Sequence, residues 1–148
     1  MKTYKADAVD PDDIVDELLN GGGAVMFKGL FAPEDIAEAR RIILEHSNND
    51  AAKVTHFQGA AAMDGKLALQ RRVWNLLAKG DVFARMATHP VLMKVLSKFL
   101  GTGFIMGSIA ANRILPGGPG QEPHVDYPYW DFHAPETHPI GLNASFPM

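Results

Sequence analysis

The sequence contains no cysteine, no long apolar run and no excess of basic residues, and each absence excludes a class of protein. Without cysteine there are no disulfides or thiolate metal sites, so any metal must be held by histidine and carboxylate ligands. No apolar run approaches the roughly 18 residues that span a bilayer. The charged N-terminal segment also lacks the apolar stretch of a signal peptide. The net charge of −3 argues against nucleic-acid and anionic-membrane partners. We therefore expect a cytoplasmic protein.

The rest of the composition is that of an ordinary globular domain. The chain has 148 residues, of which 47% are hydrophobic and 21% are charged. This length is enough to bury a core within a single domain. No internal repeat or low-complexity segment divides it. We expect one domain over residues 1–148, helical to about residue 101, with the start of a barrel from about residue 102.

Capping residues and apolar spacing predict a series of helices in the first hundred residues. Asp10 precedes the first helix as its N-cap, with proline at the following position. His89 precedes the last helix in the same way, as a capping or solvent-exposed residue. The predicted helices begin near Pro11, Pro33, Leu67 and Pro90, and a short turn or helix is predicted near Val82. Between the second and third of them, residues 51–66 are predicted to form either a surface loop or a lid beside the substrate.

Strands are predicted mainly in the last third of the chain, where small and β-branched residues replace the helical pattern. The turn signal Pro116-Gly117-Gly118-Pro119-Gly120 interrupts this region. Strands are expected at residues 24–27, at residues 104–115, around His124 and Asp126, and at residues 142–148. Helices first and strands last indicate the α+β class, with helices packed on one face of an antiparallel sheet.

His124 and Asp126 give the clearest chemical signal in the sequence. Alternate side chains of a strand point to the same face, so the imidazole and the carboxylate would lie side by side. Such a pair can supply two ligands of the 2-His-1-carboxylate triad, which binds Fe(II) and leaves positions open for a co-substrate and O₂. The spacing alone is a weak indication, because short motifs recur by chance. The surrounding sequence has to support it.

Three segments resemble the phytanoyl-CoA dioxygenase family of Fe(II)- and 2-oxoglutarate-dependent oxygenases. Residues 23–34 are similar to the N-terminal strand, turn and helix of that family, and residues 89–101 to the helix before its barrel. The third segment runs from Asn112 to Gly117 and continues with His124-Val125-Asp126. The resemblance implies N-terminal helices packed on a double-stranded β-helix, which is a jelly-roll barrel. It also implies an enzyme that couples decarboxylation of 2-oxoglutarate to hydroxylation of a C–H bond in a small molecule or acyl thioester.

The same resemblance assigns roles to single residues. His124 and Asp126 match the first two iron ligands of the family. Related halogenating enzymes replace this carboxylate with a small residue, so Asp126 favours hydroxylation. Asn112 stands where some members place a side-chain amide near the carboxylate of 2-oxoglutarate; its alternative role is to order the end of a strand. Arg72 lies near a basic position that contacts the co-substrate in some members; its alternative role is that of a surface charge on a helix.

An aromatic run follows the metal motif, and two interpretations of it remain open. Tyr127, Tyr129 and Trp130 form either barrel packing or an aromatic wall for an apolar substrate. Pro128 interrupts the regular alternation of faces, because proline fits strand edges and bends better than strand interiors.

The family places its third iron ligand, a distal histidine, and its 2-oxoglutarate-binding arginine much later in the chain. His133 and His138 follow the motif in a proline-rich loop and are interpreted as exposed residues, and no arginine follows Arg113. We therefore expect these residues to be the N-terminal portion of a longer enzyme, whose missing C-terminal half or a second copy in a homodimer completes the barrel. One alternative is a non-catalytic binding or oligomerisation module. Another is a cupin-like metal protein that uses His124, Asp126 and one of these two histidines.

Overall fold

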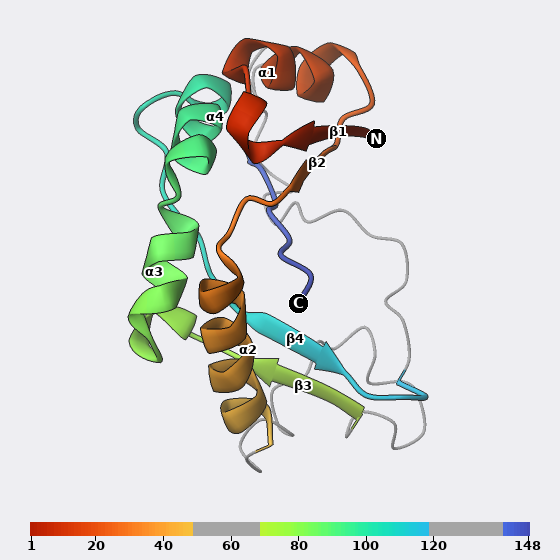
Figure 1. The fold of residues 1–148 in the computed structure, drawn as a ribbon, viewed down its shortest axis with the longest axis vertical. Helices are drawn as coiled ribbons and strands as arrows, with labels where there is room; N and C mark the ends of the chain where they lie inside the picture. Colours follow the sequence, from red (N-terminus) through yellow and green to blue (C-terminus); the bar gives the residue numbers. More distant parts are fainter. Residues whose placement is uncertain (49–68, 119–140) are drawn as a thin grey trace, which may run out of the picture. The chain divides into compact units, whose positions relative to one another are not determined.

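The computed structural model describes residues 1–48, 69–118 and 141–148, which form helices and short strands (Figure 1). In chain order the elements are β1 (Lys2–Lys5), the 3₁₀ helix η1 (Ala6–Ala8), α1 (Pro11–Asn20), β2 (Val25–Lys28), α2 (Pro33–Ser47), β3 (Gln70–Val73), the 3₁₀ helix η5 (Leu76–Ala78), α3 (Asp81–Ala87), α4 (Pro90–Leu100) and β4 (Ala111–Ile114). This mixed content agrees with the predicted α+β class. The chain contacts divide into two compact units, which are described separately.

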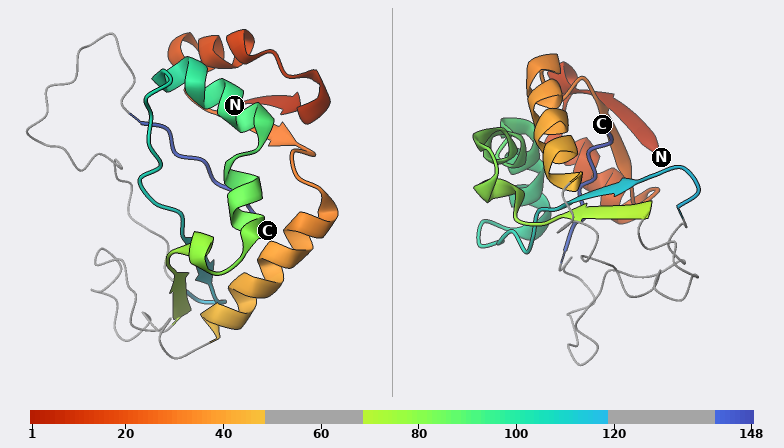
Figure 2. Two further views of the ribbon diagram at one scale, coloured as in Figure 1. Left: turned by 90° about the vertical axis from the view of Figure 1, so that its left-hand side faces the viewer. Right: turned by 90° about the horizontal axis from the view of Figure 1, so that it is seen from below.

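The first unit contains the described residues of 1–37, 82–106 and 141–148. Its helix α1 begins as predicted, because Oδ1 of Asp10 accepts a hydrogen bond from the backbone N–H of Asp12 at 2.9 Å, and Pro11 follows the cap. Figures 1 and 2 show α1 and α4 lying against each other. A salt bridge between Lys98 and Asp12 joins the two helices on their exposed side.

Strand β1 was not predicted, and it pairs in parallel with β2, in the register Lys2 to Val25 through Lys5 to Lys28. Only Tyr4 of this strand is buried. Together with Ile14 of α1 and Val95 of α4 it forms the core of this unit. At the start of the strand, Nζ of Lys2 donates to both carboxylate oxygens of Asp13 at 2.8 and 3.0 Å, and this hydrogen bonding lowers the pKa of Asp13. The parallel pairing departs from the purely antiparallel sheet that was expected.

The predicted start of α4 is confirmed. Nδ1 of His89 accepts a hydrogen bond from the backbone N–H of Val91 at 3.3 Å, so the residue acts as the helix N-cap. Its ring also meets Phe31 edge-on, with the ring centroids 5.6 Å apart. The helix ends at Gly101, whose φ of 84° lies in the left-handed region that favours glycine. Helix α3 likewise matches its prediction, with Phe83 almost completely buried.

The second unit contains the described residues of 38–81 and 107–118, and here the predicted helix over residues 67–79 is wrong. Residues 70–73 form β3, which pairs antiparallel with β4. Backbone hydrogen bonds also join the residues that flank the two strands. The N–H of Leu115 donates to the carbonyl of Leu69 at 2.8 Å, and the N–H of Leu76 donates to the carbonyl of Ile109 at 3.4 Å. Asn75, with φ of 51°, would interrupt any helix. The spacing of the apolar residues in 67–79 is compatible with a helix. The backbone N–H and C=O groups of residues 70–73 are instead satisfied by pairing with β4.

Two predicted strands also need correction. The strand expected over residues 104–115 is limited to Ala111–Ile114, and residues 104–110 have no regular structure. Residues 142–148 form no strand; Phe146 packs edge-on against Phe31 instead, with the ring centroids 5.0 Å apart. Within the described residues, residues 141–148 take part in neither sheet, and the contact of Phe146 with Phe31 lies within the first unit.

The jelly-roll barrel is not confirmed. The described residues contain two separate sheets of two strands each, and they form no closed barrel. The predicted loop at residues 51–66 and the predicted strand around His124 and Asp126 lie outside the described residues. Within the described ranges, no helix is both long enough and apolar enough to cross a lipid bilayer.

Candidate functional site

The antiparallel pair β3–β4 brings together two of the residues predicted to contact a co-substrate. In its register Arg72 lies directly opposite Asn112, and Arg71 lies opposite Arg113. Directly opposed residues of an antiparallel pair point to the same face, and successive residues alternate between the faces. Figures 1 and 2 show the two strands side by side. One face of this small sheet therefore carries Arg72 and Asn112, and the other carries Arg71 and Arg113.

The face that carries Arg72 and Asn112 is open to solvent. Asn112 is exposed and Arg72 is half-buried. Their apolar neighbours on this face are also exposed, Ile114 by 51% and Trp74 by 44%. The guanidinium carbon of Arg72 lies 4.1 Å from the centroid of the Trp74 ring, which is a cation–π contact. We call this surface, formed by Arg72, Trp74, Asn112 and Ile114, the open face.

Arg72 belongs to a strand, so the predicted helix at this position is wrong, while its alternative role as a surface charge is not tested. The strand assignment also reveals Trp74, which the sequence reasoning missed. Residues two apart on a strand share a face, so Trp74 would have been expected beside Arg72 if the segment had been read as a strand. The signal was present in the sequence but hidden by the helical interpretation of residues 67–79.

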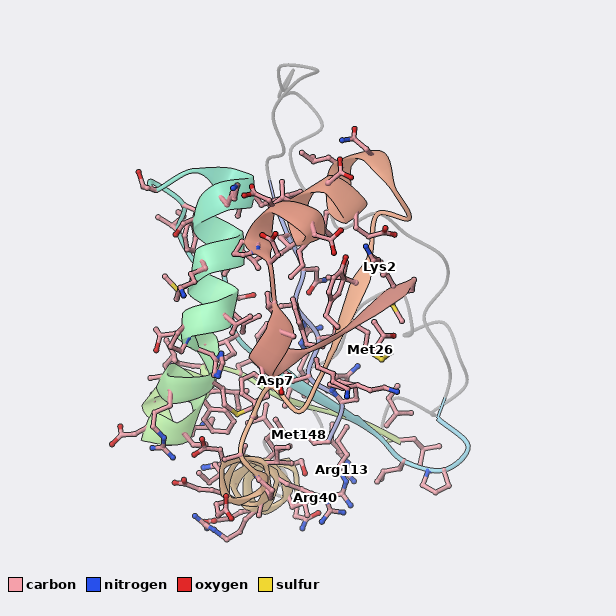
Figure 3. All side chains as sticks on the ribbon, turned by 45° about the horizontal axis from the view of Figure 1, so that its top comes forward. Lys2, Asp7, Met26, Arg40, Arg113 and Met148 are labelled. Atoms are coloured by element: carbon pink, nitrogen blue, oxygen red, sulfur yellow. The ribbon has the colours of Figure 1, made fainter. Side chains whose placement is uncertain are left out.

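The opposite face of the sheet packs against the C-terminal end of α2. Nη1 of Arg113 donates to Oγ of Ser47 at 3.1 Å and to Oδ1 of Asn48 at 2.8 Å. Figure 3 labels Arg113 beside α2, which is seen nearly end-on. Ser47 is only 1% exposed, and Val73 on the same face is 4% exposed. A cation at a helix C-terminus is favourable because the free carbonyls there carry partial negative charge. We call this surface, formed by Arg71, Val73, Ala111 and Arg113, the packed face.

The predicted iron ligands His124 and Asp126 lie outside the described residues, and so do the predicted substrate contacts Tyr127, Tyr129 and Trp130. The two later histidines, His133 and His138, lie outside them as well. Within residues 1–48, 69–118 and 141–148, no group of three or more histidine, aspartate, glutamate or cysteine side chains is arranged to hold a metal ion. The iron site therefore stays a prediction from the sequence.

A shallow cavity of about 550 Å³ lies in the first unit, between α1 and α4. It is lined by Pro11, Asp12, Met93, Lys94, Ser97 and Lys98. Wide and open, it includes none of the residues predicted to bind iron, 2-oxoglutarate or substrate. Among the residues predicted to bind iron, 2-oxoglutarate or substrate, the described structure contains Arg72 and Asn112, and both lie on the open face.

Comparison with known proteins identifies the family. The model of the phytanoyl-CoA dioxygenase family matches residues 19–146, which is most of the chain. The chain belongs to this family. The resemblance inferred from the three sequence segments is thus confirmed, and the matched range includes every predicted site residue from Arg72 to Trp130. No curated protein and no solved structure matches the chain significantly. Membership of the phytanoyl-CoA dioxygenase family indicates chemistry of the Fe(II)/2-oxoglutarate oxygenase type at the level of the family.

Proposed function

We propose that this protein is an Fe(II)- and 2-oxoglutarate-dependent dioxygenase that hydroxylates a small molecule or an acyl thioester. Membership of the phytanoyl-CoA dioxygenase family supports the class of reaction. The structural observation that supports the proposal is that Arg72 lies directly opposite Asn112 on the open face. These are the two residues that the family resemblance assigns to the co-substrate, and they come from strands about forty positions apart in the sequence.

The chemistry of this pair suits a carboxylate. A guanidinium presents several N–H donors in a planar fork that matches the two oxygens of a carboxylate. The amide of Asn112 offers a further N–H donor and, unlike a second cation, adds no repulsion beside the arginine. Arg72 and Asn112 would thus bind a carboxylate of 2-oxoglutarate.

His124 and Asp126 would hold the iron, as an imidazole nitrogen and a carboxylate oxygen are ligands that Fe(II) accepts in this class of enzyme. When bound, the iron supplies the activation of O₂ that hydroxylation of an unactivated C–H bond requires. The carboxylate of Asp126 would occupy the coordination position that halogenating relatives leave to a halide, which favours hydroxylation. Tyr127, Tyr129 and Trp130 would form the apolar wall against which the substrate lies.

The test is an anaerobic titration of the 148-residue chain with Fe(II), carried out with and without 2-oxoglutarate. We expect a weak visible absorption band when both are present, because chelation of the iron by 2-oxoglutarate gives a charge-transfer transition. In this chain, a second copy in a homodimer would supply the part of the site that His124 and Asp126 do not provide. The band should disappear in His124→Ala and in Asp126→Ala, while circular dichroism shows that both variants remain folded.

The other outcomes separate the alternatives. A folded chain that binds neither Fe(II) nor 2-oxoglutarate would overturn the proposal and support a non-catalytic binding or oligomerisation module. Binding of Fe(II) that does not respond to 2-oxoglutarate would instead favour a cupin-like metal protein. Replacement of His133 or His138 by alanine would then show whether either histidine completes that site.

A further inference from the structure

Trp74 is a large aromatic side chain in an exposed position, directly after the last residue of β3. The residue is 44% exposed, although tryptophan is, on average, among the more buried residues. Its ring contact with a charged group is to Arg72, whose guanidinium carbon lies 4.1 Å from the ring centroid. The position of this ring therefore calls for an explanation other than packing in a core.

The backbone on both sides of Trp74 is anchored. Before it, Val73 is buried and pairs with Ala111 of β4. After it, Asn75 turns the chain with a φ of 51°, and the N–H of Leu76 donates to the carbonyl of Ile109 at 3.4 Å. The side chain of Leu76 is also buried, at 4% exposure. The backbone on both sides of Trp74 is thus held by pairing with β4 and by the bond to Ile109, and the ring lies against the guanidinium of Arg72.

Stacking of this kind has a specific consequence for an arginine. The indole covers one flat side of the guanidinium, while the N–H donors lie in the guanidinium plane and point away from its edges. Stacking thus restricts the rotation of the guanidinium of Arg72, whose Nε is buried, and keeps its terminal N–H donors in a fixed direction. Asn112 lies across the strand pair from the same arginine. A carboxylate that approaches along the sheet would find the two donor groups already arranged.

We propose that Trp74 is a positioning residue for Arg72, and that it orients the guanidinium to bind a carboxylate of 2-oxoglutarate beside Asn112. This inference rests on the proposed function, because it concerns the co-substrate of the same site. It assigns Trp74 no contact with the co-substrate itself. The indole acts through the arginine alone, which makes its contribution separable from that of a direct ligand.

The experiment measures the dissociation constant of 2-oxoglutarate in the presence of Fe(II) without oxygen, for wild type, Trp74→Leu and Trp74→Phe. We expect the leucine variant to bind about threefold to tenfold more weakly, since a cation–π contact is lost. Phenylalanine keeps an aromatic face and should restore part of the affinity. Leu77→Ala is the matched control, because Leu77 is also exposed, at 41%, and contributes nothing to the open face. Thermal unfolding should be the same for all four proteins.

The decisive comparison repeats Trp74→Leu in an Arg72→Gln background. If Trp74 acts through Arg72, the second substitution should cause no further loss of affinity once the guanidinium is absent. An equal loss in both backgrounds would overturn the inference, because the indole would then contact the ligand itself. Unchanged affinity in Trp74→Leu would overturn it too, while the proposed function would stand. If wild type fails to bind 2-oxoglutarate, the proposed function fails and this inference fails with it.

Discussion

The two faces of the β3–β4 sheet use the same residue type for different purposes. Arg113 on the packed face donates to Ser47 and Asn48, and these hydrogen bonds join the sheet to the end of α2. Arg72 on the open face lies against an exposed indole and opposite Asn112. The two arginines come from neighbouring strands and lie on opposite faces of the sheet, because side chains alternate along each strand. Both arginines are partly buried, so the sheet face and the neighbouring residues, and not burial or the residue type, distinguish their surroundings.

The largest effect should come from removing buried volume next to this sheet. Leu76 is 4% exposed and Leu77 is 41% exposed, so the two adjacent leucines provide an internal comparison. We expect Leu76→Ala to lower the free energy of unfolding by about 2–5 kcal/mol, because it leaves a cavity in a packed region. Leu77→Ala should cost less than about 1 kcal/mol. Urea unfolding followed by circular dichroism would measure both free energies. Equal losses in the two variants would contradict the burial of Leu76 and the exposure of Leu77.

The next effect concerns binding and separates the two faces directly. We expect Arg72→Gln to weaken binding of 2-oxoglutarate about tenfold to a hundredfold, because a charge-assisted hydrogen bond is lost. Arg71→Gln changes the adjacent arginine on the other face and should leave the affinity within about twofold. Isothermal titration calorimetry under anaerobic conditions with Fe(II) would measure both constants. Similar losses in the two variants would mean that general positive charge, and not the open face, attracts the co-substrate.

A smaller effect is expected when the packed face loses its link to α2. Arg113→Ala should lower the free energy of unfolding by about 1–2 kcal/mol, since two hydrogen bonds are removed and Ser47 is buried. Affinity for 2-oxoglutarate should be retained under conditions where the variant is folded. A double-mutant cycle with Asn48→Ala would give the energy of that single hydrogen bond. Absence of coupling would show that Arg113 and Asn48 do not interact in solution.

The smallest effect on stability should follow replacement of Ile114, the aliphatic residue of the open face. Ile114 is 51% exposed, and we expect Ile114→Lys to change the free energy of unfolding by no more than about 0.5 kcal/mol. Chemical unfolding would measure it against wild type. A loss of several kcal/mol would mean that this face is covered in the protein in solution, and the contrast between the two faces would have to be given up.

The features that were predicted correctly from the sequence are those that depend on residues close together in the chain. The start of α1 at Asp10 and the start of α4 at His89 follow from local capping interactions, and both are confirmed. Strands β1 and β3 were not predicted, because each is stabilised by a partner distant in the sequence. Lys2–Lys5 pairs with Val25–Lys28, and Gln70–Val73 pairs with Ala111–Ile114. A helical spacing of apolar residues cannot reveal that such a partner exists.

The same reasoning applies to the candidate site. The resemblance to the phytanoyl-CoA dioxygenase family identified Arg72 and Asn112 one at a time, and family membership is confirmed. It did not indicate that the two residues face each other, because that depends on the register of two strands. Trp74 was missed for the same reason, since its relation to Arg72 follows only from a strand assignment. The roles of His124 and Asp126 stay predictions from the sequence.

The core formed by Tyr4, Ile14 and Val95 has a consequence for the synthesis of the chain. Its members come from β1, α1 and α4, so the ribosome must add residues 29–95 after α1 and β2 before this core can close. At about 5–20 residues per second, that interval lasts roughly 3–13 s. During this time the apolar side chains of the nascent N-terminal segment have no permanent cover. A chaperone that binds emerging apolar segments would have its main opportunity there, before Val95 leaves the exit tunnel.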